Sequence, residues 1–123
     1  MRRGAKEILL DGAVGNRQDH TLVNLYLLFL MDSAGVKGAI ADDYSVMEIV
    51  SKGTVEISDR WSYFSLLNMT GTAKGVTIRG AKFPLENGTI TPEDQYATSN
   101  EVLPGQTAEV SVAEGRLLLL KIR

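Results

Sequence analysis

The sequence of 123 residues has no cysteine, one histidine and one tryptophan. Without cysteine, disulfides, thiolate nucleophiles and cysteine-ligated zinc sites are excluded. A zinc site made by this chain alone would combine His20 with carboxylates only, which is an uncommon ligand set. No G-x-S-x-G motif surrounds a serine, so a nucleophile elbow is not indicated either. We therefore expect no metal, no cofactor and no catalytic site within this chain.

Long apolar runs and basic clusters are also missing. The longest apolar stretch, NLYLLFLM at 24–31, is about eight residues, whereas a membrane-spanning helix needs about 20. The basic N-terminus lacks the apolar segment of a secretory signal. With 13 basic and 15 acidic residues the net charge is −2, and Arg2–Arg3 is the largest basic cluster. Because nucleic-acid binding requires a positive surface, we expect no binding to nucleic acid. Because no apolar stretch is long enough to span a membrane, we expect a soluble protein that does not bind a membrane. Its compartment stays unassigned.

Residues 1–44 are predicted to form a strand, a loop and a helix. The strand is KEILL at 6–10, and the helix runs from Thr21 to Ala34 without an internal proline or glycine. Gly35 follows at the position where a left-handed residue commonly ends a helix.

Apolar side chains cover nearly the whole circumference of this helix. A helix of that kind is buried on more than one side. One strand and one helix cannot supply so much burial by themselves. We therefore expect the helix to pack on the rest of the chain, on a partner domain or on a second copy. Leu22, Leu25 and Phe29 are its candidate interface residues.

Residues 45–123 alternate apolar and polar side chains with a period of two. Turn signals separate the short runs, among them Asn87-Gly88 and Glu114-Gly115. The last run, RLLLLKI at 116–122, carries leucines on both faces and is expected to be covered on both sides. The pattern predicts a mainly β protein, an antiparallel β-sandwich of about six to eight short strands with one buried N-terminal α-helix.

The stretch RWSYF at 60–64 contains the strongest candidate for a binding surface. In a strand, Trp61 and Tyr63 lie on one face, whereas Phe64 and Leu66 lie on the other and face the sandwich interior. Two interpretations of the outer pair stay open. The rings could pack against the helix or a subunit contact, which we favour, or they could form a flat platform that binds a sugar.

Two pairs of neighbouring carboxylates, Asp42-Asp43 and Glu93-Asp94, are candidates for catalytic or calcium-binding groups. A retaining glycosidase needs two carboxyl groups about 5 Å apart across a cleft, and neighbours in a loop usually point apart. The ligand spacing of an EF-hand is absent. Solvated turns are the expected role of both pairs.

Three stretches resemble the C-terminal end of glycoside hydrolases of the family 42 β-galactosidase type. They are LYLLFLMDSAGVKG, VMEIVSKGTVEISDRWSYFSLLNMTG and EVLPGQTAEVSVAEGRLLLLKI. Those enzymes end in an α/β trimerisation domain followed by a small β-sandwich, and their two catalytic glutamates lie in a barrel absent from this chain. The resemblance implies a non-catalytic accessory domain that acts through packing and oligomerisation, as a homo-oligomer or within a larger glycosidase.

Other interpretations remain beside that resemblance. The chain could be a carbohydrate-binding module that uses Trp61 and Tyr63, or a free-standing oligomeric structural protein. The stretch VEISDRWSYFSLLN followed by GVTIRGAKF also loosely resembles the RNA-binding tail of some DEAD-box helicases. Arg79 and Lys82 are nearly the only basic residues there, and the net charge of −2 argues against RNA binding.

Overall fold

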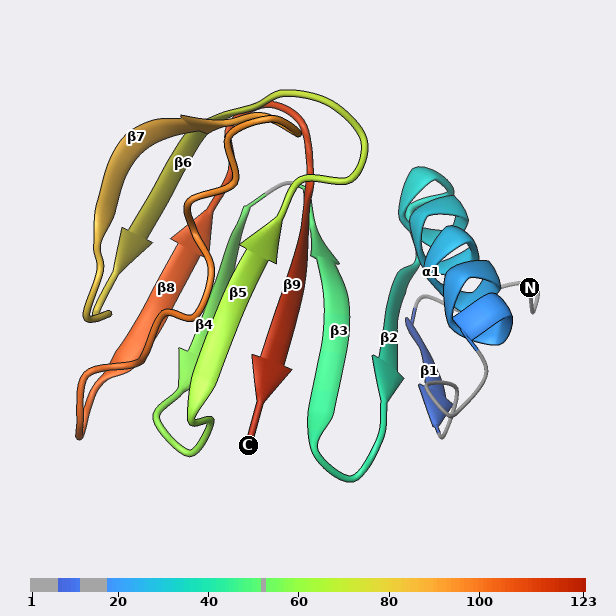
Figure 1. Ribbon diagram of the computed structural model, residues 1–123, viewed down its shortest axis with the longest axis horizontal. Coiled ribbons are helices and arrows are strands. Elements are labelled where there is room, and N and C mark those ends of the chain that lie inside the picture. The colour runs from blue at the N-terminus through green and yellow to red at the C-terminus, as the bar shows by residue number, and fades with distance from the viewer. Residues whose placement is uncertain (1–6, 12–17, 52) are drawn as a thin grey trace. The chain divides into compact units, whose positions relative to one another are not determined.

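The computed structural model describes residues 7–11, 18–51 and 53–123 and is mainly β, with one helix (Figure 1). Its contacts divide the chain into two compact units, Met1–Ile49 and Val50–Arg123. The sequence pattern instead suggests a division near residue 44, where the helical period gives way to the strand period.

The first unit contains β1 (Glu7–Asp11), α1 (Gln18–Ser33), β2 (Lys37–Ala41) and most of β3 (Ser45–Val50). Strand β1 pairs with β2 in parallel, and β2 pairs with β3 antiparallel. A parallel pair requires a crossover connection, which α1 provides here. The strand and helix predicted in this region are both present, but the parallel pairing was not predicted.

Helix α1 ends at Gly35, which has a φ of +76°. The amide of Val36 donates to the carbonyl oxygen of Met31 at 2.8 Å, and the amide of Gly35 donates to that of Asp32 at 3.0 Å. These two bonds form a Schellman motif, whose left-handed residue is usually glycine. The predicted left-handed end of the helix is confirmed.

One side of α1 is buried against β2. Leu28 and Met31 are buried, and a Cβ added to Gly38 of β2 would lie 2.5 Å from Met31 Cε. The opposite side exposes the apolar side chains of Val23, Tyr26, Leu27 and Leu30. Coverage of that second side by a partner or a second copy stays a prediction.

The turn between β2 and β3 is organised by Asp42. Its Oδ1 accepts hydrogen bonds from the amides of Tyr44 and Ser45, both at 2.8 Å, and from the Ser45 hydroxyl at 3.2 Å. The hydrogen bond from the Tyr44 amide, joined by those from Ser45, lowers the pKa of the Asp42 carboxyl below 3.8. The predicted turn at this carboxylate pair is confirmed.

This lowered pKa predicts a small acid-dependent contribution to stability. A carboxyl whose pKa falls on folding stabilises the protein above its unfolded pKa, and the contribution is lost as the pH falls through the folded value. We expect Asp42→Asn, which keeps an acceptor oxygen, to flatten the decrease of melting temperature between about pH 5 and pH 3. Asp43→Asn is the control. An equal flattening in both variants would contradict the assignment to Asp42.

The second unit is a sandwich-like arrangement of antiparallel strands (Figure 1). Its strands are β4 (Thr54–Ser58), β5 (Tyr63–Leu67), β6 (Ala73–Arg79), β7 (Leu85–Ile90), β8 (Thr107–Ser111) and β9 (Leu117–Ile122). Four of them form a sheet in the order β4-β8-β6-β7, and β5 pairs with β9 with Leu66 opposite Leu119. The mainly β, sandwich-like fold predicted from the period of two is confirmed.

The core of this unit comes from alternate residues of these strands. Phe64 and Leu66 of β5 are fully buried, as are Leu117 and Leu119 of β9, as predicted. The four-stranded sheet contributes a matching buried row: Ile57, Ala73, Val76, Ile78, Ile90, Ala108 and Val110. Burial of alternate positions is what a pleated sheet with one packed face requires.

Among the described helices, none combines the length and the apolar character that a membrane crossing demands.

Candidate ligand-binding site

A pocket of about 120 Å³ lies where the connection between β6 and β7 meets the loop between β7 and β8. It is lined by Ile78, Phe83, Pro84, Leu85, Tyr96, Ala97, Thr98 and Asn100. The lining is mostly apolar, with two aromatic rings and a few polar groups. That composition is typical of small-molecule sites.

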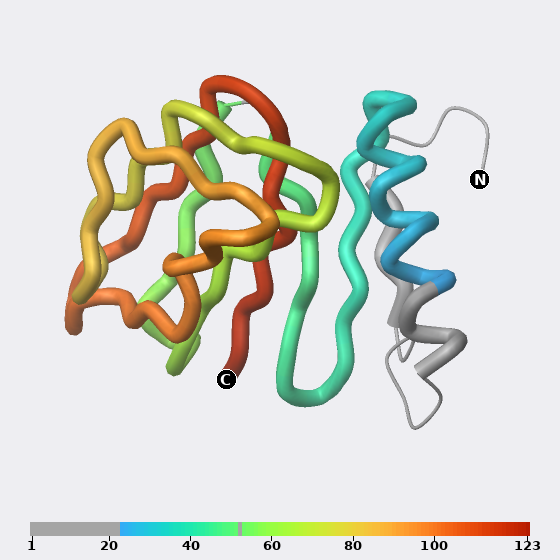
Figure 2. Tube along the Cα trace, turned by 45° about the horizontal axis from the view of Figure 1, so that its top comes forward, coloured from blue at the N-terminus to red at the C-terminus, as the bar shows by residue number. Residues whose placement is uncertain are grey.

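The β7–β8 loop is held in place by backbone pairing on two sides. Phe64 and Asn100 exchange two backbone hydrogen bonds, at 2.9 and 2.8 Å, which extends the pairing of β5. On the other side, the Lys82 amide donates to the Glu101 carbonyl oxygen at 2.8 Å. Figure 2 shows this loop, in orange, passing beside β5. The pocket wall is therefore anchored to the core.

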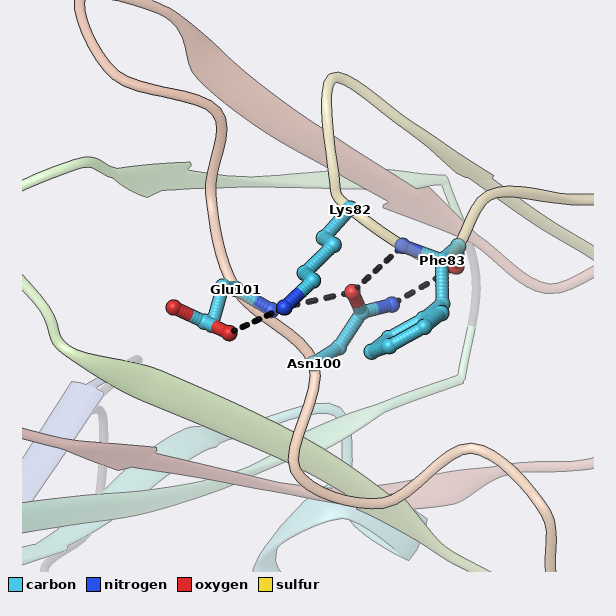
Figure 3. Close-up of polar contacts among 4 residues, drawn as sticks. All are labelled: Lys82, Phe83, Asn100 and Glu101. Carbon is cyan, nitrogen blue, oxygen red and sulfur yellow. Dashed lines mark hydrogen bonds and ion pairs between the residues drawn. The ribbon is translucent and has the colours of Figure 1, made fainter.

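Asn100 is the central polar residue of the site, and its side chain is only 2% exposed. Its Nδ2 donates to the carbonyl oxygen of Phe83 at 2.8 Å, and its Oδ1 accepts from the amide of Phe83 at 3.0 Å (Figure 3). The same oxygen accepts from the Glu101 amide at 2.9 Å. The amide group thus pairs with Phe83 as a neighbouring strand would and fixes the position of that residue.

Two aromatic rings of the pocket remain open to solvent. Phe83 is 56% exposed and Tyr96 is 48% exposed, although large apolar surfaces are usually buried. The Tyr96 hydroxyl donates to the Thr89 carbonyl oxygen at 2.8 Å, which fixes the ring's orientation. These rings can stack on a flat ligand and attract a positive charge through their faces.

Charges at the edge of the pocket balance one another. Lys82 Nζ lies 5.5 Å from the centroid of the Phe83 ring and 3.4 Å from Glu101 Oε2 (Figure 3). Because the carboxylate offsets the ammonium charge, this edge does not repel a cationic ligand as an isolated lysine would.

Ser99, beside the pocket, has a φ of +55°. Residues other than glycine seldom adopt this left-handed conformation, which costs about 1–2 kcal/mol. The Ser99 amide donates to Ser65 Oγ at 2.9 Å, which helps to hold the residue in place. Strained residues of this kind concentrate at functional sites.

Comparison with known families identifies the domain that carries this pocket. Residues 52–117 match the family model "Thiamin pyrophosphokinase, vitamin B1 binding domain". The match covers more than half of the chain and includes every residue that lines the pocket. The chain belongs to this family.

Relatives of the family extend the similarity beyond the matched residues. A thiamine pyrophosphokinase of Bacillus subtilis is 27% identical over 116 residues, which cover 93% of this chain and 54% of that protein. The crystal structure of a thiamin pyrophosphokinase from Geobacillus thermodenitrificans is 29% identical, with a TM-score of 0.85, and the match covers 98% of this chain and 56% of that one. The Bacillus subtilis crystal structure gives a TM-score of 0.87 at 24% identity, over 95% of this chain and 55% of that one. The chain therefore spans about half the length of these relatives.

The predicted resemblance to family 42 glycoside hydrolases is wrong, because the chain belongs to the vitamin B1 binding domain family. The glycosidase accessory role, the carbohydrate-binding module and the free-standing structural protein are wrong with it. The features that suggest this resemblance include the alternating strand VEI at 55–57, Asn68 at the end of a strand and the turn Pro104-Gly105. Those features follow from the physics of antiparallel sheets in general, so they do not separate one sandwich family from another.

The residues of the predicted sugar platform do not line the pocket. Trp61 is 5% exposed and lies in the turn before β5, so the strand alternation assumed for it does not apply. Tyr63 is the first residue of β5 and is exposed. The prediction that Trp61 and Tyr63 bind a carbohydrate depended on the carbohydrate-binding interpretation. That interpretation is wrong, so the prediction is no longer supported.

The predicted helix interface stays a prediction. Leu25 and Phe29 are half-buried, whereas the side chain of Leu22 lies outside the described residues, as does that of His20. The described residues include no group of three histidines, cysteines or acidic residues that could hold a metal ion.

Sequence reasoning missed Phe83, Tyr96 and Asn100. Their proximity depends on pairing between residues 17 positions apart. No local period reveals such a pairing.

Proposed function

We propose that the pocket binds thiamin and that this chain is the vitamin-binding part of a thiamin pyrophosphokinase. The family match supports the choice of ligand, and the exposed aromatic pair of Phe83 and Tyr96 supports the location. The relatives are named for a pyrophosphokinase activity, and this chain spans about half of their length. We propose that activity for a protein in which this domain acts together with a counterpart of their other half.

The chemistry of the pocket suits thiamin in two respects. Thiamin joins a flat aminopyrimidine ring to a positively charged thiazolium ring. Exposed faces of Phe83 and Tyr96 can stack on the first ring or attract the second, an interaction of about 0.5–2 kcal/mol for a cation over an aromatic face. The Glu101 carboxylate, which already offsets Lys82, lowers the electrostatic cost of bringing a cation to this edge.

Phe83→Ala tests the proposal by isothermal titration calorimetry with thiamin. We expect binding to weaken by about tenfold or more, since stacking on one aromatic side chain contributes about 1–3 kcal/mol. The melting temperature should change little because the Phe83 ring is more than half exposed.

The matched control is Tyr44→Ala, which removes an exposed aromatic ring from the β2–β3 turn, outside the family match. Its thiamin affinity should equal that of the unmodified chain. The proposal fails if the unmodified chain binds no thiamin or if Phe83→Ala binds it as tightly as Tyr44→Ala does.

A further inference from the structure

The pocket-lining part of the β7–β8 loop pairs with β5 in an irregular register. Asn100 exchanges two backbone hydrogen bonds with Phe64, at 2.9 and 2.8 Å. In a regular antiparallel ladder the next hydrogen-bonded pair lies two residues further along each strand, so Leu66 would pair with Thr98. The Leu66 amide instead donates to the carbonyl oxygen of Ala97, at 2.8 Å. Between these two contacts the loop therefore contains one residue more than β5.

An extra residue of this kind forms a β-bulge, in which two residues on one strand lie opposite a single residue on the other. Here Thr98 and Ser99 lie opposite Ser65 of β5. A bulge bends the chain and changes the direction of nearby side chains, and bulges are frequent next to active sites. This bulge is part of the pocket wall, because Ala97, Thr98 and Asn100 all line the pocket.

The bulge depends on an unfavourable backbone conformation. Ser99 has a φ of +55°, in the left-handed region that residues other than glycine seldom adopt. Such a conformation persists only where the surrounding structure maintains it. One contact that does so comes from Ser65, whose Oγ accepts a hydrogen bond from the Ser99 amide at 2.9 Å. Because a bulge leaves its extra residue without a partner in the ladder, the Ser65 side chain here takes the place of a backbone acceptor.

We propose that Ser65 is a positioning residue for the thiamin pocket. Its hydroxyl maintains the left-handed conformation of Ser99, and the resulting bulge places Thr98 and Asn100 in the pocket wall. The inference rests on the proposed thiamin site, although neither Ser65 nor Ser99 lines the pocket. Without the hydroxyl acceptor, Ser99 can relax toward an ordinary strand conformation. The loop then shifts toward the regular pairing of Leu66 with Thr98, and a shift of one residue changes the face on which side chains lie.

Ser65→Val and Ser65→Thr are a matched pair for calorimetry with thiamin, because both side chains are β-branched and they differ in the hydroxyl group. We expect Ser65→Val to weaken thiamin binding about three- to tenfold, as for the loss of one hydrogen bond, and Ser65→Thr to stay within about twofold of the unmodified chain. The control is Ser58→Ala. It removes another serine acceptor, which binds the Arg60 amide at 3.3 Å outside the pocket lining, and it should leave thiamin affinity unchanged.

Ser99→Gly separates positioning from a merely structural role. Glycine adopts a positive φ without steric cost, so it no longer needs the Ser65 hydroxyl to maintain the bulge. Added to Ser65→Val, Ser99→Gly should therefore recover most of the lost thiamin affinity, although it restores no hydrogen bond to residue 65. A merely structural role would lower the melting temperature without changing the affinity of the folded protein, and there would then be no affinity to recover.

Hydrogen exchange of the Ser99 amide, followed by NMR, tests the proposal without thiamin. We expect this amide to exchange at least about tenfold faster in Ser65→Val than in Ser65→Thr. An unmodified chain that binds no thiamin would refute the proposed function, whereas the exchange rates would still decide whether Ser65 maintains the bulge. Equal exchange in the two variants, equal thiamin affinity in both, or equal weakening by Ser58→Ala would overturn the proposal. If Ser65→Val does not fold, Ser65→Ala takes its place in each comparison.

Discussion

Asn100→Ala should lower the free energy of unfolding by about 2–4 kcal/mol and weaken thiamin binding at least about tenfold. The substitution leaves the amide and carbonyl of Phe83 and the amide of Glu101 without their side-chain partner. Each buried polar group that loses its partner costs about 1–3 kcal/mol. Because the backbone of Phe83 is then released, the ring proposed to stack on thiamin is no longer held. Urea unfolding and calorimetry with thiamin measure the two effects.

Asn68→Ala is a closely matched control for this variant. Asn68 is also 2% exposed, and its side chain also makes three hydrogen bonds to the backbone. Its Nδ2 donates to Ile90, and its Oδ1 accepts from Thr70 and Gly71, so none of its bonds reaches Phe83. We expect a similar loss of stability with thiamin affinity retained in the folded protein. Equal loss of binding in both variants would show that Asn100 acts only through general stability.

The strands of this domain were predictable because sheet burial is a local pattern. Alternation at Phe64 and Leu66 placed both residues in the core, and Gly35 marked the end of the helix. The parallel pairing of β1 with β2 was not predictable in this way. It depends on how α1 returns the chain to the sheet, and a period of two does not distinguish parallel from antiparallel neighbours.

The candidate site was missed because loops build it on a scaffold that the strands provide. The three stretches that suggested a glycosidase cover 25–38, 46–71 and 101–122, and they omit 72–100, the segment that contains Phe83, Tyr96 and Asn100. A resemblance confined to the end of α1, the strands and their short turns reports the architecture that many families share. Function resides in the connections that such a sandwich holds in place.

The rigidity of that scaffold rests on residues such as Phe64, which is 0% exposed. Phe64→Ala should lower the free energy of unfolding by about 3–5 kcal/mol, because it removes buried surface and leaves a cavity between β5 and the four-stranded sheet. The urea midpoint should fall while the slope of the transition stays unchanged. Tyr63→Ala, at the exposed neighbouring position of the same strand, should cost less than about 1 kcal/mol.

Phe64→Ala also separates the contribution of the core from that of the site. The backbone of residue 64, which exchanges two hydrogen bonds with Asn100, is unchanged by the substitution. Below its lowered melting temperature the variant should therefore bind thiamin with nearly normal affinity, in contrast to Asn100→Ala. If Phe64→Ala weakened binding as much as Asn100→Ala while still folded, the pocket would depend on core packing as a whole. The amide of Asn100 would then not be the group that positions Phe83.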